Sequence, residues 1–127
     1  MHGELRKARC TECGAVFRWQ EDLGAETVCP ACERVGRVRP HIVWFGEMPF
    51  ELDAIFAALE KVDLFICIGT SGVVYPAAGF ASTAAKRFGC HLIEMNIEDT
   101  AISRQFHERI IGPVAVELPR LVGRLLG

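Results

Sequence analysis

Residues 63–72 read Asp-Leu-Phe-Ile-Cys-Ile-Gly-Thr-Ser-Gly, an apolar run that ends at a Gly-Thr-Ser loop. A strand buried on both faces of a parallel sheet has this pattern, because neither face needs polar side chains. The run His91–Asn96 has the same character, and the Ala-rich segment Pro76–Phe88 between the two has helical spacing. Strands that alternate with helices predict an α/β fold with a parallel sheet.

The segments on either side of this unit continue the alternation. We expect strands at Ala15–Trp19, Arg37–Val38, His41–Phe45 and Val114–Leu118, and helices at Phe50–Lys61, Thr100–Glu108 and Pro119–Leu126. Ligands of open α/β sheets bind outside the carboxyl ends of the strands. The loops that follow Phe45, Ile68 and Met95 are therefore the candidate binding loops.

Four cysteines near the N-terminus have the spacing C-x2-C-x15-C-x2-C and are Cys10, Cys13, Cys29 and Cys32. Four thiolates in two such knuckles form a closed tetrahedral site, which is typical of one structural Zn²⁺. A redox pair is the first alternative, but the second knuckle argues against it. The second alternative is a zinc ribbon that binds nucleic acid, but residues 4–38 mix acidic and basic side chains and therefore form no basic patch for it. Cys67 and Cys90 lie in apolar stretches and are interpreted as small buried side chains.

Composition excludes several classes of protein. The 127 residues carry a net charge of -2 and no basic block, so we expect no nucleic-acid partner. No apolar run reaches the roughly 18 residues that a membrane span needs, and the N-terminus has no signal-peptide pattern. Paired cysteines without an export signal favour metal binding and reduced thiols, so we expect a cytoplasmic protein.

Five strings in order along the chain carry a family resemblance: His2-Gly3, the cysteine quartet, Arg39–Pro49, Gly69–Phe80 and Glu94–Asn96. Together they resemble the sirtuins, NAD-dependent protein-lysine deacylases, and specifically the bacterial branch whose members also remove succinyl groups. The resemblance implies part of a Rossmann-like parallel sheet with helices, plus a four-cysteine zinc-ribbon module. It divides the chain into residues 1–39, with the catalytic histidine and the zinc module, and residues 40–127, part of the NAD-binding domain.

The resemblance also implies roles for individual residues. Nicotinamide leaves NAD, the acyl oxygen attacks the ribose, and His2, as general base, then deprotonates a ribose hydroxyl, so that the acyl group ends on ADP-ribose. A neutral imidazole suits that step. The implied cofactor-binding residues are Gly69, Thr70, Ser71, Asn96, Ile97, Glu98 and Val114. The residues implied to bind the acylated-lysine protein substrate are Val43, Trp44, Phe45, Gly46, Glu47, Val73 and Tyr75.

Purely structural interpretations of several of these residues remain open beside the functional roles. Position 2 is also compatible with a solvated histidine at a frayed terminus, and the aromatic side chains of Trp44, Phe45 and Tyr75 are compatible with ordinary core packing. His41, His91 and His107 match no functional position of the family and are interpreted as structural or solvated.

The resemblance covers only the second half of a sirtuin. The Gly-Ala-Gly phosphate loop, the Gln-Asn-Ile-Asp stretch and the Tyr and Arg that select acidic acyl groups do not occur in this sequence. We therefore expect the chain to need a complementing N-terminal half for activity. We also expect the edge of Leu64–Ile68 to be uncovered, which makes the chain alone marginal in solution. The alternatives are a non-catalytic, zinc-stabilised module that binds acylated peptide or another protein, and a non-functional remnant.

Overall fold

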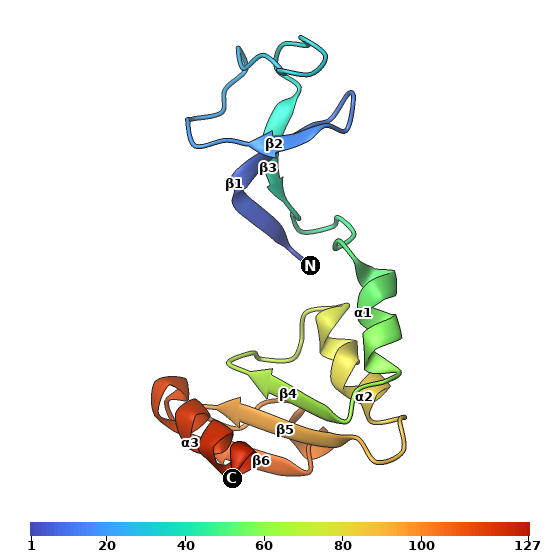
Figure 1. Cartoon of the computed structure of the whole chain (residues 1–127), viewed down its shortest axis with the longest axis vertical. Helices are drawn as coiled ribbons and strands as arrows, with labels where there is room; N and C mark the ends of the chain where they lie inside the picture. Colours follow the sequence, from blue (N-terminus) through green and yellow to red (C-terminus); the bar gives the residue numbers. More distant parts are fainter. The chain divides into compact units, whose positions relative to one another are not determined.

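A computed structural model describes all 127 residues (Figure 1). The chain divides into two compact units, Met1–Leu52 and Asp53–Gly127, and each is described by itself. No helix in either unit combines the length and the apolar character that crossing a membrane requires.

The first unit is a three-stranded antiparallel sheet in the order β2-β1-β3. Its strands are β1 (Gly3–Cys10), β2 (Val16–Arg18) and β3 (Val38–Ile42). Between β1 and β3 the register jumps from Glu4 opposite His41 to Ala8 opposite Pro40, so three residues of β1 bulge out of the ladder. The small core contains Ala8, Val38 and two of the cysteines. Such a core has few large apolar side chains, as expected of a metal-stabilised module.

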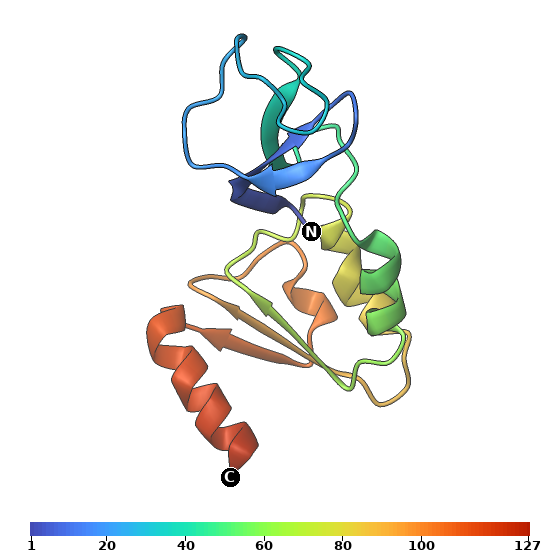
Figure 2. The same ribbon diagram turned by 45° about the horizontal axis from the view of Figure 1, so that its top comes forward.

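The second unit is built on a three-stranded parallel sheet in the order β4-β5-β6. Its strands are β4 (Leu64–Ile68), β5 (His91–Asn96) and β6 (Glu108–Ile111). Helices cover both faces of the sheet (Figure 2): α1 (Leu52–Leu59), a 3₁₀ turn η1 (Ala77–Gly79) and α2 (Phe80–Ala84) belong to one side, and α3 (Val114–Leu126) to the other. The predicted α/β fold with a parallel sheet and a small cysteine module is confirmed.

The central strand β5 explains why the sheet needs helices on both faces. Leu92 packs in a cluster with Leu59 of α1, whereas its neighbour Ile93 packs with Leu121 of α3 on the opposite face. Successive side chains of a strand point to opposite faces, so a doubly apolar strand must be covered twice. The outer strand β4 is only half-buried and pairs with β5 alone, so its other edge is uncovered, as the sequence predicted.

Three predictions for the C-terminal part of the chain need correction. Val114–Leu118, expected as a strand, is the first part of α3, and the last strand is β6. Thr100–Glu108, expected as a helix, contains only the 3₁₀ turn η2 (Ser103–Gln105). Pro119 was expected to start a helix but lies inside α3, where Leu118 and Leu121 both pack on the sheet. The helical spacing of these apolar side chains outweighs the hydrogen bond that Pro119 cannot donate.

Two further predictions need correction. His41–Phe45 is not a strand of the parallel sheet, because His41 and Ile42 end the antiparallel β3 of the first unit. The residues after Ile42 leave the sheet and enter a turn. The helix expected over Pro76–Phe88 is confined to η1 and the short α2, since the chain turns away after Ala84.

Candidate functional site

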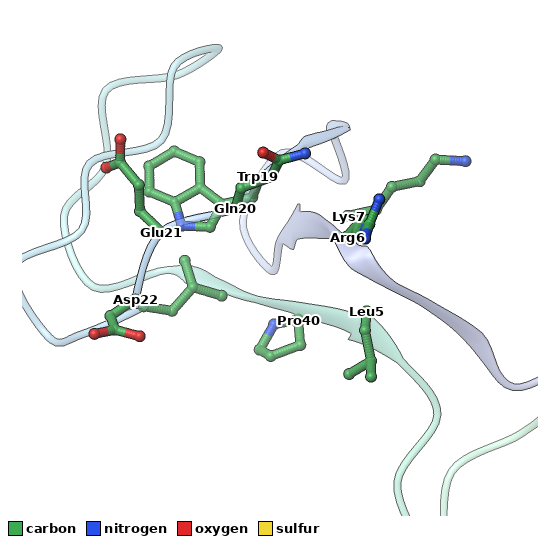
Figure 3. A pocket seen from close by; sticks show the side chains of 9 residues that line it. Leu5, Arg6, Lys7, Trp19, Gln20, Glu21, Asp22 and Pro40 are labelled. Carbon is green, nitrogen blue, oxygen red and sulfur yellow. The ribbon is translucent and has the colours of Figure 1, made fainter.

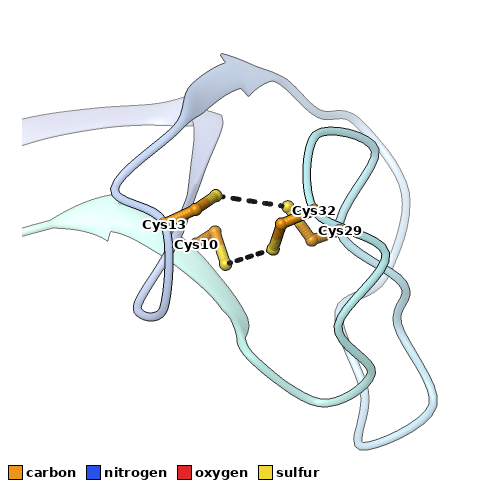
Figure 4. Close-up of side chains that lie close together, drawn as sticks. All are labelled: Cys10, Cys13, Cys29 and Cys32. Atoms are coloured by element: carbon orange, nitrogen blue, oxygen red, sulfur yellow. Dashed lines mark hydrogen bonds between the residues drawn. The ribbon is translucent and has the colours of Figure 1, made fainter.

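The cysteine quartet comes together at one end of the first unit (Figure 4). All four sulfur atoms lie within 4.8 Å of one another. The Sγ atoms of Cys10 and Cys32 are 3.7 Å apart, and those of Cys13 and Cys29 are 3.8 Å apart. These distances are too long for disulfides. They equal the sulfur–sulfur edge of about 3.8 Å that a tetrahedron with Zn–S bonds of about 2.3 Å has. The donor set and its geometry therefore fit a closed zinc site.

Two thiols of the quartet, Cys10 and Cys32, have pKa values shifted in opposite directions. Backbone N–H groups of Cys13 and Glu12 donate to the Cys10 sulfur and lower the pKa of Cys10 to about 7. The Arg34 backbone N–H lowers the pKa of Cys32, but burial and the neighbouring thiols outweigh it and raise that pKa to about 12. The two directions differ because the first thiolate is stabilised by donors, whereas the last must form beside negative charge. A divalent cation among the four sulfurs removes that penalty.

His2 is exposed, and its backbone is fixed at the start of β1. The Val43 N–H donates to the His2 carbonyl oxygen at 2.9 Å, and the Phe50 N–H donates to the Met1 carbonyl oxygen at 2.9 Å. Gly3 allows this approach: a Cβ at that position would lie 2.0 Å from the His41 carbonyl oxygen. The structure thus brings together the predicted general base and the start of the predicted peptide-binding segment.

The segment Trp44–Glu47 is a tight turn. The Glu47 N–H donates to the Trp44 carbonyl oxygen at 3.0 Å, which closes a four-residue β-turn. Gly46, the third residue of the turn, has φ +85°, and a type II β-turn requires a positive φ at that position. The side chain of Phe45 at the tip is 96% exposed. Core packing of Phe45 is therefore not observed, and the turn presents an aromatic side chain to its surroundings.

In the second unit, the loops after β4 and β5 line one cavity of about 350 Å³. Its lining comprises the predicted cofactor residues Gly69, Thr70, Ser71, Asn96, Ile97 and Glu98, together with Val73, Asp99, Thr100 and Ala101. The volume is in the range of about 300–1,000 Å³ that is usual for small-molecule sites. The carboxyl ends of these two neighbouring strands therefore line one cavity, which is where the parallel topology predicts ligands to bind.

Asn96 ties the two loops together. Its side-chain amide donates to the Thr70 carbonyl oxygen at 2.9 Å, and its side-chain oxygen accepts from the Ile97 N–H at 2.9 Å. The Gly69 N–H donates to the Met95 carbonyl oxygen at 3.0 Å. The cavity wall is thus held by hydrogen bonds before any ligand enters.

The cavity carries carboxylates and no basic side chain. Glu98 and Asp99 both line it, and Asp99 is 3.0 Å from Arg109. Carboxylates accept hydrogen bonds from sugar hydroxyls, as in dinucleotide-binding folds, but repel phosphate. Because Arg109 compensates Asp99, Glu98 is the free carboxylate of the lining, and with the Thr70 and Ser71 hydroxyls it makes the cavity chemically suited to a ribose.

Two predicted residues lie apart from that cavity. Tyr75 is 78% exposed and does not line it, so core packing of Tyr75 is not observed either. Val114, at the start of α3, lines a separate apolar hollow with other residues of that helix.

A larger hollow in the first unit was not predicted. It has a volume of about 640 Å³, and basic side chains of β1 lie on one side and acidic side chains of the loop after β2 on the other (Figure 3). The lining residues include Arg6, Lys7, Trp19, Glu21 and Asp22. It arises beside the bulge in β1, and a bulge of that kind leaves no periodic signal in a sequence.

Comparison with known proteins identifies the family. The model of the Sir2 family matches residues 1–76. An NAD-dependent protein deacylase of Vibrio parahaemolyticus is 51% identical over 126 residues, which are 99% of this chain and 52% of that protein. An NAD-dependent protein deacylase of Escherichia coli K12 is 47% identical over 126 residues, or 99% of this chain and 45% of that protein. The chain belongs to the Sir2 family, and it spans about half the length of the curated relatives it matches.

Solved structures agree with this assignment. A Sir2 homologue in complex with NAD has a TM-score of 0.82 and 34% identity, and the match covers 99% of this chain and 51% of that one. A variant Sir2 homologue in complex with 2'-O-acetyl ADP ribose has a TM-score of 0.80 and 34% identity, and the match covers 99% of this chain and 52% of that one. The expected resemblance to the sirtuins is confirmed, over about half the length of these relatives.

Proposed function

We propose that this chain supplies the general base, the peptide-binding turn and the ribose side of the NAD site in an NAD-dependent protein-lysine deacylase. The observation that carries the proposal is the identity of about half of all residues, over almost the whole chain, with relatives named NAD-dependent protein deacylase. NAD supplies an activated ribose that accepts the acyl group, with release of nicotinamide. The unit Met1–Leu52 provides the base, the zinc module and the peptide-binding turn, and the unit Asp53–Gly127 provides the cofactor loops together with Val73 and Tyr75.

The cavity of the second unit supports the cofactor part of the proposal. In our assignment the hydroxyls of Thr70 and Ser71, beside Gly69, bind a phosphate or ribose oxygen. Asn96 contacts the adenosine ribose, with Ile97 and Glu98 beside it. Val114, outside this cavity, offers its backbone to the adenine. The Glu98 carboxylate fits hydroxyl groups, and no basic side chain lines the cavity, so we assign most of the pyrophosphate contacts to a phosphate loop outside this chain. We propose that a separate N-terminal half with the phosphate loop is the partner.

The turn of the first unit supports the substrate part. Val43–Glu47 offers backbone groups to an extended acyl-lysine peptide, as in strand addition, where main-chain hydrogen bonds supply affinity without strict sequence preference. In our assignment, Val73 and Tyr75 contact the other side of that peptide. His2 accepts the proton of the ribose hydroxyl that takes up the acyl group.

The quartet completes the assignment as a structural site. We propose that Cys10, Cys13, Cys29 and Cys32 hold one Zn²⁺, because their sulfur geometry matches a closed tetrahedron. Reduced thiols of this kind fit a cytoplasmic protein. We propose deacetylation and desuccinylation as the activities, because the sequences of Trp44–Pro49 and Thr70–Gly79 resemble the bacterial branch whose members also remove succinyl groups.

The test measures O-acyl-ADP-ribose by mass spectrometry. The zinc-loaded chain is incubated with NAD and an acetyl-lysine or a succinyl-lysine peptide, with and without the N-terminal half of the Vibrio parahaemolyticus relative. We expect product only when the N-terminal half is present. No product with either peptide in the reconstituted mixture contradicts the proposed function, provided that the two halves are shown to associate. Product from the chain alone contradicts the need for a partner.

A further inference from the structure

The carboxylate of Glu47 accepts four hydrogen bonds from donors of the same chain, although its side chain is 32% exposed. Both its oxygens accept hydrogen bonds from the Arg39 guanidinium, one of them at 3.1 Å from Nη2. That same oxygen accepts the Trp44 N–H at 2.9 Å and lies 3.5 Å from Nη2 of Arg9. A carboxylate with this many donors has little capacity left for a ligand.

Arg39 links this carboxylate to the turn in two further ways. Its guanidinium lies over the Trp44 ring, 3.4 Å from the ring centroid, and its Nη2 donates to the Ile42 carbonyl oxygen at 3.2 Å. The Arg39 side chain is only 15% exposed. A fork that pairs bidentately with a carboxylate and stacks on an indole fixes both partners, and a lysine cannot replace it.

The residues that flank the turn hold the N-terminal segment. Val43 donates to the His2 carbonyl and Phe50 to the Met1 carbonyl. The Phe50 ring stacks on His41 at 4.7 Å and lies under Arg9, whose guanidinium is 5.5 Å from the ring centroid. Arg9, which binds Glu47, therefore also contacts Phe50, and Arg39 contacts Ile42 and Trp44, the two chain neighbours of Val43.

We propose that Glu47 is a positioning residue, which through Arg39 and Arg9 holds the Phe45 turn and the His2 backbone in one fixed arrangement. In this role the Glu47 side chain acts within the chain, and only the backbone of Glu47 is left to offer groups to the peptide. This inference rests on the proposed function for the peptide-binding role of the turn. The arrangement itself is a property of the first unit and is testable without any activity.

The test compares Glu47→Gln and Arg39→Lys with the wild-type chain, and Glu26→Gln is the matched control. Glu26 is an exposed glutamate of the same unit, so its replacement removes the same charge without touching the turn. Amide hydrogen exchange is measured at Val43, Trp44 and Phe50 in the zinc-loaded chain. Zinc content by elemental analysis shows that each variant keeps the folded module.

Hydrogen bonds to charged groups stabilise the folded state more than neutral ones do. Removing one partner of this network should therefore speed hydrogen exchange at these three amides by about 10-fold or more. Glu26→Gln should leave exchange unchanged. A double variant that combines Glu47→Gln with Arg39→Lys should lose no more exchange protection than Glu47→Gln alone, because the effects of two substitutions in one network do not add. Unchanged protection in zinc-loaded Glu47→Gln overturns the proposal, and additive losses overturn the route through Arg39.

Binding of a fluorescent acetyl-lysine peptide gives the functional reading. If the wild-type chain binds it, Glu47→Gln should weaken binding by about 10-fold. Equal affinity despite faster exchange overturns the positioning role. If the wild-type chain binds no peptide, the proposed function of the turn fails, and the exchange data alone decide whether Glu47 fixes the arrangement.

Discussion

Replacing Cys29 by serine should remove the zinc and unfold the first unit while the second unit stays folded. Cys29 is fully buried in a cluster with Ala8, Cys10 and Val38, and the larger side chains around this cluster are only partly buried: Phe17, Trp19 and Leu23. Structural zinc contributes about 10–16 kcal/mol in small modules, which is as much as the whole stability of about 5–15 kcal/mol of an ordinary domain. A module with this core has no comparable replacement for the lost metal.

Tryptophan fluorescence reports on the first unit alone, because both tryptophans of the chain, Trp19 and Trp44, lie in it. For Cys29→Ser we expect no bound zinc by elemental analysis and the emission of solvent-exposed indoles. Far-ultraviolet circular dichroism should keep the helical signal, since α1, α2 and α3 do not depend on the quartet.

Cys90→Ser is the matched control. Cys90 is also buried, but it packs against Leu92 in the second unit. This variant should keep one zinc per chain and native tryptophan emission. Retained zinc together with native emission in Cys29→Ser would refute the assignment of the quartet and the dependence of the first unit on metal.

Two further predictions concern the cofactor loops and the turn. Asn96→Ala removes the hydrogen bond to Thr70 that joins the two loops, so in the reconstituted enzyme it should raise the Michaelis constant for NAD by about 10-fold; an unchanged constant would argue against the ribose role. The Arg39 hydrogen bonds lower the pKa of Glu47 to about 2, below the value of about 4.3 of a free glutamate. Ionised Glu47 therefore stabilises the turn above about pH 4.3, and this contribution is lost as the pH falls toward about 2. Trp44 emission in a Trp19→Phe background should stay constant between about pH 5 and 9, whereas a transition near about pH 6.5 would implicate a histidine instead.

The sequence predicted the parts of the fold whose signals are local. β4 and β5 are apolar runs in a parallel sheet, and the cysteine spacing is sufficient to indicate a closed site. β6 was missed because an outer strand needs only one covered face, so Glu108 and Arg109 can occupy it without an apolar run. The helix that contains Pro119 was misread because proline usually marks a helix start.

The candidate site was predictable where loops follow recognised strands. Gly69 and Asn96 were placed correctly at one cavity because the carboxyl ends of neighbouring parallel strands meet there. The position of Trp44–Glu47 was not predicted correctly. His41 and Ile42 resemble the start of a buried parallel strand, but they end the antiparallel strand β3. The network of Arg9, Arg39 and Glu47 depends on contacts between residues up to 38 positions apart, which no local pattern encodes.

The measurement that tests the central claim most directly compares His2→Ala with the wild-type chain, each reconstituted with an N-terminal half. Acyl-ADP-ribose formed from NAD and an acetyl-lysine peptide is quantified by mass spectrometry, and zinc content confirms that both chains are folded. Loss of a general base predicts a product rate lower by about 100-fold or more. A rate within about 3-fold of wild type, well short of that loss, would contradict the assignment of His2 as the base.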